Sequence, residues 1–137
     1  MAVLFPKHFL ALLEHNEGPV WVGEVPYDIA TRLGLKNHNV YLVRDSLIHI
    51  LDGHPDINAN TLMHLPLAIK NGLWVQERND PRYVIVSYIS PEIINRHTVV
   101  MKITANRSEI WLTSFYRARA RQTMSLLKRG IILRDHN

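Results

Sequence analysis

Two histidines lie close together near the middle of the chain, and hydroxyl and guanidinium groups gather near its end. His49 and His54 belong to the segment 45–55, and the second group belongs to Ser114-Phe-Tyr-Arg-Ala-Arg-Ala-Arg121. Histidine can take or give a proton near neutral pH. Arginine can stabilise the negative charge that builds on a phosphoryl group. If the two segments meet, their side chains suit cleavage of RNA without a metal ion, in which a base activates the 2′-hydroxyl.

The surroundings of His54 predict a position at the end of a helix. Asp45 or Ser46 can begin that helix, which we expect to run to residue 51. Gly53 can end it in a left-handed conformation, and Pro55 prevents its continuation. His54 is then expected just outside the helix in an extended conformation, where its role is either catalytic or that of a polar turn residue.

His49 has a different expected role. It lies two residues from both Leu47 and Leu51. This spacing favours a partly buried core histidine over a catalytic one.

The end of the last long strand supplies the other candidates. Thr113 and Ser114 should face opposite sides, so only one hydroxyl can point into a cleft. Tyr116 is a further catalytic candidate, with packing as its ordinary role. Five cations are candidate phosphate contacts, with solvated surface as the alternative for each: Arg117, Arg119, Arg121, Arg44 and Lys36.

Length and composition limit the class of protein. The 137 residues suffice for one domain with a single core, and 47% apolar with 20% charged residues is ordinary for a globular chain. The 16 basic and 12 acidic residues give a formal net charge of +4, which favours an anionic partner such as nucleic acid. No apolar run reaches the length of a membrane span, and the first residues lack a basic leader, so we expect neither membrane anchor nor signal peptide.

Missing motifs exclude several activities. The chain has no cysteine, which excludes disulfides and thiolate metal sites and fits a reducing, cytoplasmic location. It lacks a His-Glu-x-x-His zinc motif, a glycine-rich phosphate loop and a Gly-x-Ser-x-Gly elbow. We therefore expect no metal site and no cofactor.

Local signals predict a mixture of helices and strands. Helices are expected over 6–15, 27–33, 45–51 and 119–128, with a further one that begins after Asn58 or Asn60, restarts at Pro66 and stops at residues 71–72. In the last helix, Met124 and Leu127 should face inward. Strands are expected over 20–25, 40–43, 73–77, 83–89, 97–104 and 109–115, with an edge strand over 131–133. Short connections between the four central strands predict an antiparallel meander.

Several of these segments resemble one nuclease group. The stretch Val40-Tyr-Leu-Val-Arg-Asp-Ser-Leu-Ile-His49, followed by Gly-His54-Pro-Asp and then Leu65-Pro66, is similar to the helical half of phage-associated members of the barnase–EndoU–colicin–RelE-like nuclease superfamily. Tyr83-Val-Ile-Val-Ser87, Val99-Val-Met-Lys-Ile103 and Trp111-Leu-Thr-Ser-Phe-Tyr116 resemble its sheet. The resemblance covers residues 19–137 as one nuclease domain and leaves residues 1–18 as a separate N-terminal helix.

The resemblance implies a fold and an activity. It implies an α+β single domain with helices packed on one face of a roughly four-stranded antiparallel sheet. It also implies a metal-independent endoribonuclease that leaves a cyclic phosphate, acts as a phage or mobile-element toxin, and has an acidic immunity or antitoxin partner. The helix-end histidine is then His54, with His49 second. The strand hydroxyl is Ser114 or Thr113, and the phosphate contact is Arg117 or Arg44. His97, at the start of its strand, is the available second histidine.

Two other classes of function compete with this prediction. A nucleic-acid- or partner-binding module on the same scaffold would need the arginines but no catalytic base, and its affinity would depend on salt. A structural phage component would have a large surface patch and no cleft.

Overall fold

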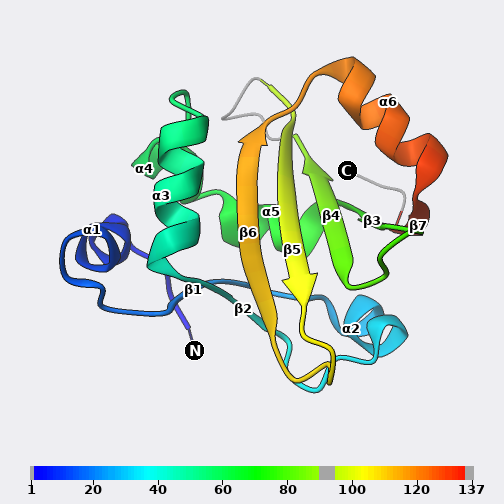
Figure 1. The fold of residues 1–137 in the computed structure, drawn as a ribbon, viewed down its shortest axis with the longest axis horizontal. Coiled ribbons are helices and arrows are strands. Elements are labelled where there is room, and N and C mark those ends of the chain that lie inside the picture. Colours follow the sequence, from blue (N-terminus) through cyan, green and yellow to red (C-terminus); the bar gives the residue numbers. More distant parts are fainter. Residues whose placement is uncertain (1, 90–94, 135–137) are drawn as a thin grey trace.

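Seven strands pair into one mixed sheet in the computed structural model, which describes residues 2–89 and 95–134 (Figure 1). Their order across the sheet is β1-β2-β6-β5-β4-β3-β7. All neighbouring pairs are antiparallel except β2 and β6, which are parallel. The strands are β1 (Val20–Glu24), β2 (Asn39–Leu42), β3 (Leu73–Gln76), β4 (Tyr83–Tyr88), β5 (His97–Ile103), β6 (Ile110–Arg117) and β7 (Ile131–Arg134).

The predicted α+β class is confirmed, but the predicted four-stranded antiparallel sheet is wrong. The four strands β3 to β6 do form the expected antiparallel meander. β7 adds to the free edge of β3, while β1 and β2 add to β6. The parallel β2–β6 pair joins segments about 70 residues apart in the chain, a long-range pairing that short connections could not reveal.

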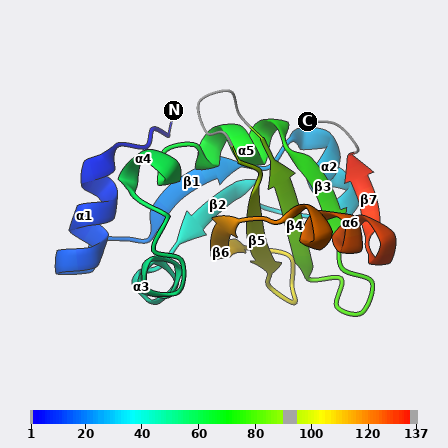
Figure 2. The same cartoon turned by 90° about the horizontal axis from the view of Figure 1, so that it is seen from above.

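Six helices accompany the sheet in the described ranges, and they do not share one face. They are α1 (Pro6–His15), α2 (Tyr27–Leu33), α3 (Arg44–Gly53), α4 (Ala59–Leu62), α5 (Leu65–Asn71) and α6 (Ala120–Arg129). Figure 2 shows α5 on one side of the sheet and α6 on the other, with α3 beside β6 toward the side of α6. The prediction that all helices cover a single face is therefore wrong.

Two hydrophobic cores explain this arrangement. The main core lies between the helices and one sheet face, and includes Leu47 and Ile50 of α3 and Phe115 of β6. A small second core joins Val75 and Ile85, on the opposite sheet face, to Leu126 of α6. In α6 the expectation for Met124 is wrong: its side chain is 61% exposed, whereas Leu126 is 4% exposed.

Local sequence signals set some of the helix ends. Gly34 ends α2 with φ 68°, the left-handed conformation that glycine adopts at low cost. The Asn58 side chain accepts a hydrogen bond from the Thr61 backbone N–H and begins α4, as expected. At α3 the prediction was less accurate. The helix begins at Arg44, after an uncapped Val43, and includes Gly53 as its last residue. Among the described glycines only Gly34 has a positive φ, so Gly53 is not a left-handed cap.

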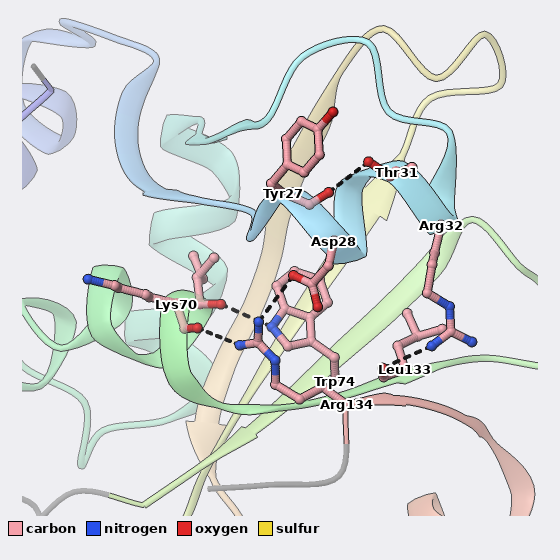
Figure 3. Close-up of polar contacts among 9 residues, drawn as sticks. Tyr27, Asp28, Thr31, Arg32, Lys70, Trp74, Leu133 and Arg134 are labelled. Atoms are coloured by element: carbon pink, nitrogen blue, oxygen red, sulfur yellow. Dashed lines mark hydrogen bonds and ion pairs between the residues drawn. The ribbon is translucent and has the colours of Figure 1, made fainter.

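Two arginines, Arg134 of β7 and Arg32 of α2, connect the last strand to two helices through hydrogen bonds and an ion pair (Figure 3). Arg134 donates to the Lys70 carbonyl at 2.6 Å and forms an ion pair with Asp28 at 3.4 Å. Arg32 of α2 donates to the Leu133 carbonyl at 3.0 Å. These bonds connect β7 with α2 and α5, far from the ends of α3 and β6.

Among the described helices, none is both long enough and apolar enough to cross a membrane.

Candidate active site

Helix α3 lies along a part of β6 that has no second strand partner. β2 pairs with β6 only at Val40–Ile110 and Tyr41–Trp111, near the start of β6. Beyond that point α3 packs against β6 in place of a strand (Figure 1). The end of α3 therefore contacts the end of β6. This is the contact between segments 45–55 and 114–121 on which the predicted site depends.

The contact between them is a stack of His54 on Tyr116. The ring centroids are 5.1 Å apart and the rings are inclined by 26°. His54 follows the last residue of α3, with its backbone N–H bonded to the Ile50 carbonyl, and both rings are half-buried. An imidazole and a phenol are thus held side by side at an accessible position, where one group can accept a proton and the other can donate one.

Of the two strand hydroxyls, Ser114 shares the sheet face of Tyr116. Ser114 is in register with Val100, and Tyr116 with Thr98, two residues earlier on β5. The register shift at this point leaves Thr113 as an extra residue, and its hydroxyl donates to the Val100 carbonyl at 3.1 Å. Since Thr113 is engaged with the backbone, Ser114 is the available hydroxyl.

A pocket of about 340 Å³ opens next to Tyr116, between the sheet and α6. Arg121 and Arg129 of α6 line it, together with Thr98 of β5. Both arginines are exposed, and Arg129 is also 3.7 Å from the Glu77 carboxylate. Two guanidinium groups, hydroxyls and an aromatic ring are groups that bind phosphate and base. Arg129 and Thr98 were not predicted as site residues. For Arg129 a signal was present, since it belongs to the stretch 117–134, which has six basic residues and no acidic residue.

Three of the other predicted cations are not among the residues that line this pocket. Arg117 is exposed and in register with His97, so it leaves β6 on the face opposite Tyr116. Arg119 is exposed at the start of α6. Arg44 begins α3, about 15 Å from its other end, and donates to the Leu13 carbonyl at 2.8 Å.

Lys36 lies at the opposite end of β6. It is exposed, and its backbone N–H donates to the Arg107 carbonyl in the β5–β6 turn at 2.9 Å. The structure therefore does not join Lys36 to the stacked pair.

The expected core position of His49 is wrong. His49 is exposed and lines a shallow depression formed by α3 alone, together with Asp45 and Asp52. The reason is helical geometry: Leu47 and Ile50 are the inward residues, and His49 points away from them. No described contact joins His49 to β6, so it is not part of the stacked pair.

His97 is buried on the other face of the sheet. It is in register with Arg117, and its ring contacts Phe115 at a centroid distance of 5.4 Å. Burial lowers the pKa of His97 from the ordinary 6.5, although the Asn95 carbonyl at 2.9 Å from Nδ1 and the charge of Asp56 act in the opposite direction. His64 lies near enough for its charge to act on His97, and its own Nδ1 is buried without a hydrogen-bond partner among the described residues. His97 therefore cannot serve as the second histidine beside Tyr116.

A second pocket, of about 740 Å³, lies near the β1 edge and contains none of the predicted site residues. Its lining includes Trp21, Tyr27, Pro66, Leu67, Lys70 and Arg134. Within the part of the chain that is described, no three histidine or carboxylate side chains are grouped so that they could hold a metal ion.

Comparisons with known proteins add no relative. No family model, no curated protein and no solved structure matches this chain. The geometry of the stacked pair and of the adjoining pocket is therefore the basis for a functional assignment.

Proposed function

We propose that the protein is a metal-independent endoribonuclease whose cleavage centre lies at His54 and Tyr116. The observation that carries the proposal is the stack of these two rings at the open end of β6. Ser114 lies on the same sheet face, and Arg121 and Arg129 line the adjoining pocket. A base, a proton donor and phosphate-binding cations are the groups that transesterification of RNA needs.

The proposed reaction balances without another reagent. His54 takes the proton from the 2′-hydroxyl, and the resulting oxygen attacks the adjacent phosphorus. The bond from phosphorus to the 5′-oxygen breaks, and the Tyr116 hydroxyl protonates that oxygen as it leaves. Arg121 and Arg129 bind the phosphoryl oxygens as their charge increases. The products are a 2′,3′-cyclic phosphate and a 5′-hydroxyl, after which the proton on His54 returns to Tyr116 directly or through water.

The biological setting is part of the same proposal. A small basic ribonuclease of this kind suits a phage or mobile-element toxin that acts in the cytoplasm. Its inhibitor would be an acidic immunity or antitoxin protein, because carboxylates facing Arg121 and Arg129 would occupy the places of RNA phosphates.

Total RNA incubated with the protein in excess chelator tests this proposal. We expect cleavage by the wild-type protein and its loss in His54→Ala. His15→Ala is the matched control, since His15 is an exposed helix-end histidine of α1. Circular dichroism of each variant establishes that its fold is retained. Full cleavage by a folded His54→Ala protein would overturn the assignment.

One observation favours a second function, a binding module without catalysis. His97, the other sheet histidine, faces away from Tyr116, so the site lacks a paired histidine. This alternative predicts salt-sensitive RNA binding with no cleavage product, and with binding retained in His54→Ala.

A further inference from the structure

Aromatic side chains and one lysine form a continuous row across the start of β6. Tyr41 of β2 is in register with Trp111 of β6, Trp111 with Lys102 of β5, and Lys102 with Tyr83 of β4. Residues in register on neighbouring strands share a sheet face. The aromatic row, as we call Tyr41, Trp111, Lys102 and Tyr83, therefore spans four strands on one face. Trp21 of β1 is in register with Tyr41 and continues the aromatic character to the sheet edge.

The members of the row contact one another and remain half-buried. The rings of Tyr41 and Trp111 are 6.3 Å apart between centroids and inclined by 52°. The Lys102 ammonium lies 5.3 Å from the centre of the Tyr83 ring. All four side chains are partly exposed. Ring surface and a cation are thus presented to solvent together, as on the platforms that bind single-stranded nucleic acids.

The row lies on the same face as the proposed cleavage centre. On β5, Lys102 and Thr98 are four residues apart and so point to the same side. Their β6 partners are Trp111 and Tyr116. Four residues of strand span about 13 Å, which corresponds to about four stacked nucleotides, and to fewer in an extended strand.

None of the described helices lies in front of this part of the sheet in Figure 1. Helix α6 contacts the face through Leu126, over Val75 and Ile85. Aromatic pairs also strengthen strand pairing. Here, however, the row includes a lysine between the rings and lies on the same sheet face as Tyr116, neither of which a purely structural pair requires.

The charge of Lys102 is available to a phosphate. The nearby carboxylate of Asp80 has a lowered pKa, chiefly because Arg82 donates a hydrogen bond to it, with a smaller contribution from Lys102. Arg82 Nε is 3.4 Å from Asp80 Oδ1, so that carboxylate is already paired. An RNA strand over the row would place its bases on the rings and a phosphate near Lys102.

We propose that the aromatic row is a base-stacking subsite for single-stranded RNA, a few nucleotides from the scissile bond. This inference rests on the proposed ribonuclease function. It makes single-stranded RNA the substrate class, because bases in a duplex are stacked on one another and cannot lie flat on protein rings. It also predicts that substrates long enough to reach the row bind better than dinucleotides.

Binding and cleavage measured separately test the subsite. The binding probe is a 2′-O-methyl RNA of about ten nucleotides, which lacks the attacking hydroxyl and resembles the site sizes of known single-strand binders. Trp111→Leu should weaken its binding about 5- to 100-fold, since stacking is lost at one base. Trp111→Phe should restore most of the affinity, and Tyr27→Leu, which removes an exposed ring from α2, should have no effect. Cleavage of a dinucleotide should be the same in Trp111→Leu and wild type.

The outcomes separate the subsite from the ribonuclease proposal. Wild-type affinity in a folded Trp111→Leu protein, or equal binding of single-stranded and duplex RNA, would overturn the subsite and leave cleavage standing. Trp111-dependent binding by a protein that cleaves nothing would support the subsite and overturn the ribonuclease. Equal loss in Trp111→Leu and Trp111→Phe, with thermal stability unchanged, would also count against stacking.

Discussion

At the scale of single residues, His54 and Tyr116 form the proposed cleavage centre, and His97 lies on the opposite face of the sheet. All three lie near the ends of β5 and β6, yet His97 faces the core and Tyr116 faces the pocket side. Sequence spacing identified His54 as a helix-end residue, because Pro55 prevents the helix from continuing. It could not place His49 correctly, since leucines two residues away on either side do not define the buried face of a helix.

Tyr116→Phe tests the proposed proton donor. The substitution keeps the ring that stacks on His54 and removes only the hydroxyl. We expect kcat for RNA cleavage to fall about 100-fold or more with little change in KM, the usual size of a lost general acid. An unchanged kcat in the folded variant would remove Tyr116 from the reaction.

His97 should make the stability of the fold depend on pH. Because burial lowers its pKa in the folded protein, the unfolded chain binds a proton more readily once the pH falls below about 6.5. The contribution of neutral His97 to the free energy of unfolding is then complete above pH 6.5. It is lost as the pH falls toward the lowered pKa of His97 in the folded protein. The unfolding free energy should fall by at most about 1.4 kcal/mol per pH unit from this group.

Urea titrations of wild type and His97→Gln between pH 7.5 and about pH 5 measure that dependence. The groups that face His97 from neighbouring elements are Asp56, His64 and Arg117, and they remain in both proteins. The variant should show a shallower dependence of unfolding free energy on pH. Parallel curves would show that His97 takes no part in it.

At the scale of elements, the sequence correctly predicted some helix ends and strand pairings that depend on residues close together in the chain. Gly34 and Asn58 end and begin their helices as expected, and the strands from β3 to β6 form the expected meander. The parallel pairing of β2 with β6 and the burial of Leu126 in place of Met124 depend on distant partners. No pattern within a short window contains those partners, so these features could not be predicted from it.

Leu126→Ala should release α6 from the sheet. Leu126 packs on Val75 and Ile85, and its loss leaves a cavity that should cost about 2 to 4 kcal/mol of unfolding free energy. Met124→Ala is the control on the same helix, and its exposed side chain predicts a change within about 0.5 kcal/mol. Equal effects in chemical denaturation would show that α6 is not fastened through Leu126.

At the scale of the whole molecule, one sheet face carries the pocket, the stacked pair and the aromatic row. The sequence predicted Tyr116 and Arg121 as site residues, and both line the pocket. It could not predict the row, because Tyr41, Lys102 and Trp111 lie on three strands whose register is set by the fold. The net charge of +4 favours a polyanion such as the proposed RNA substrate, and Arg121 and Arg129 add positive charge at the pocket.

The salt dependence of RNA binding distinguishes the effect of the net charge from that of the pocket arginines. Arg121→Gln should lower the slope of log Kd against log salt by about 0.7 to 1, as expected when one phosphate contact is lost. Lys7→Gln removes one positive charge from α1, away from the pocket, and should leave the slope unchanged. Equal slopes in all three proteins would mean that Arg121 makes no phosphate contact.

The most direct test of a cleavage centre at His54 and Tyr116 is the mass of the RNA ends made in excess chelator. We expect fragments with a 2′,3′-cyclic phosphate and a 5′-hydroxyl, produced by wild type and absent with folded His54→Ala. Fragments ending in a 3′-hydroxyl and a 5′-phosphate, or cyclic phosphates made equally well by the variant, would contradict a cleavage centre at His54 and Tyr116.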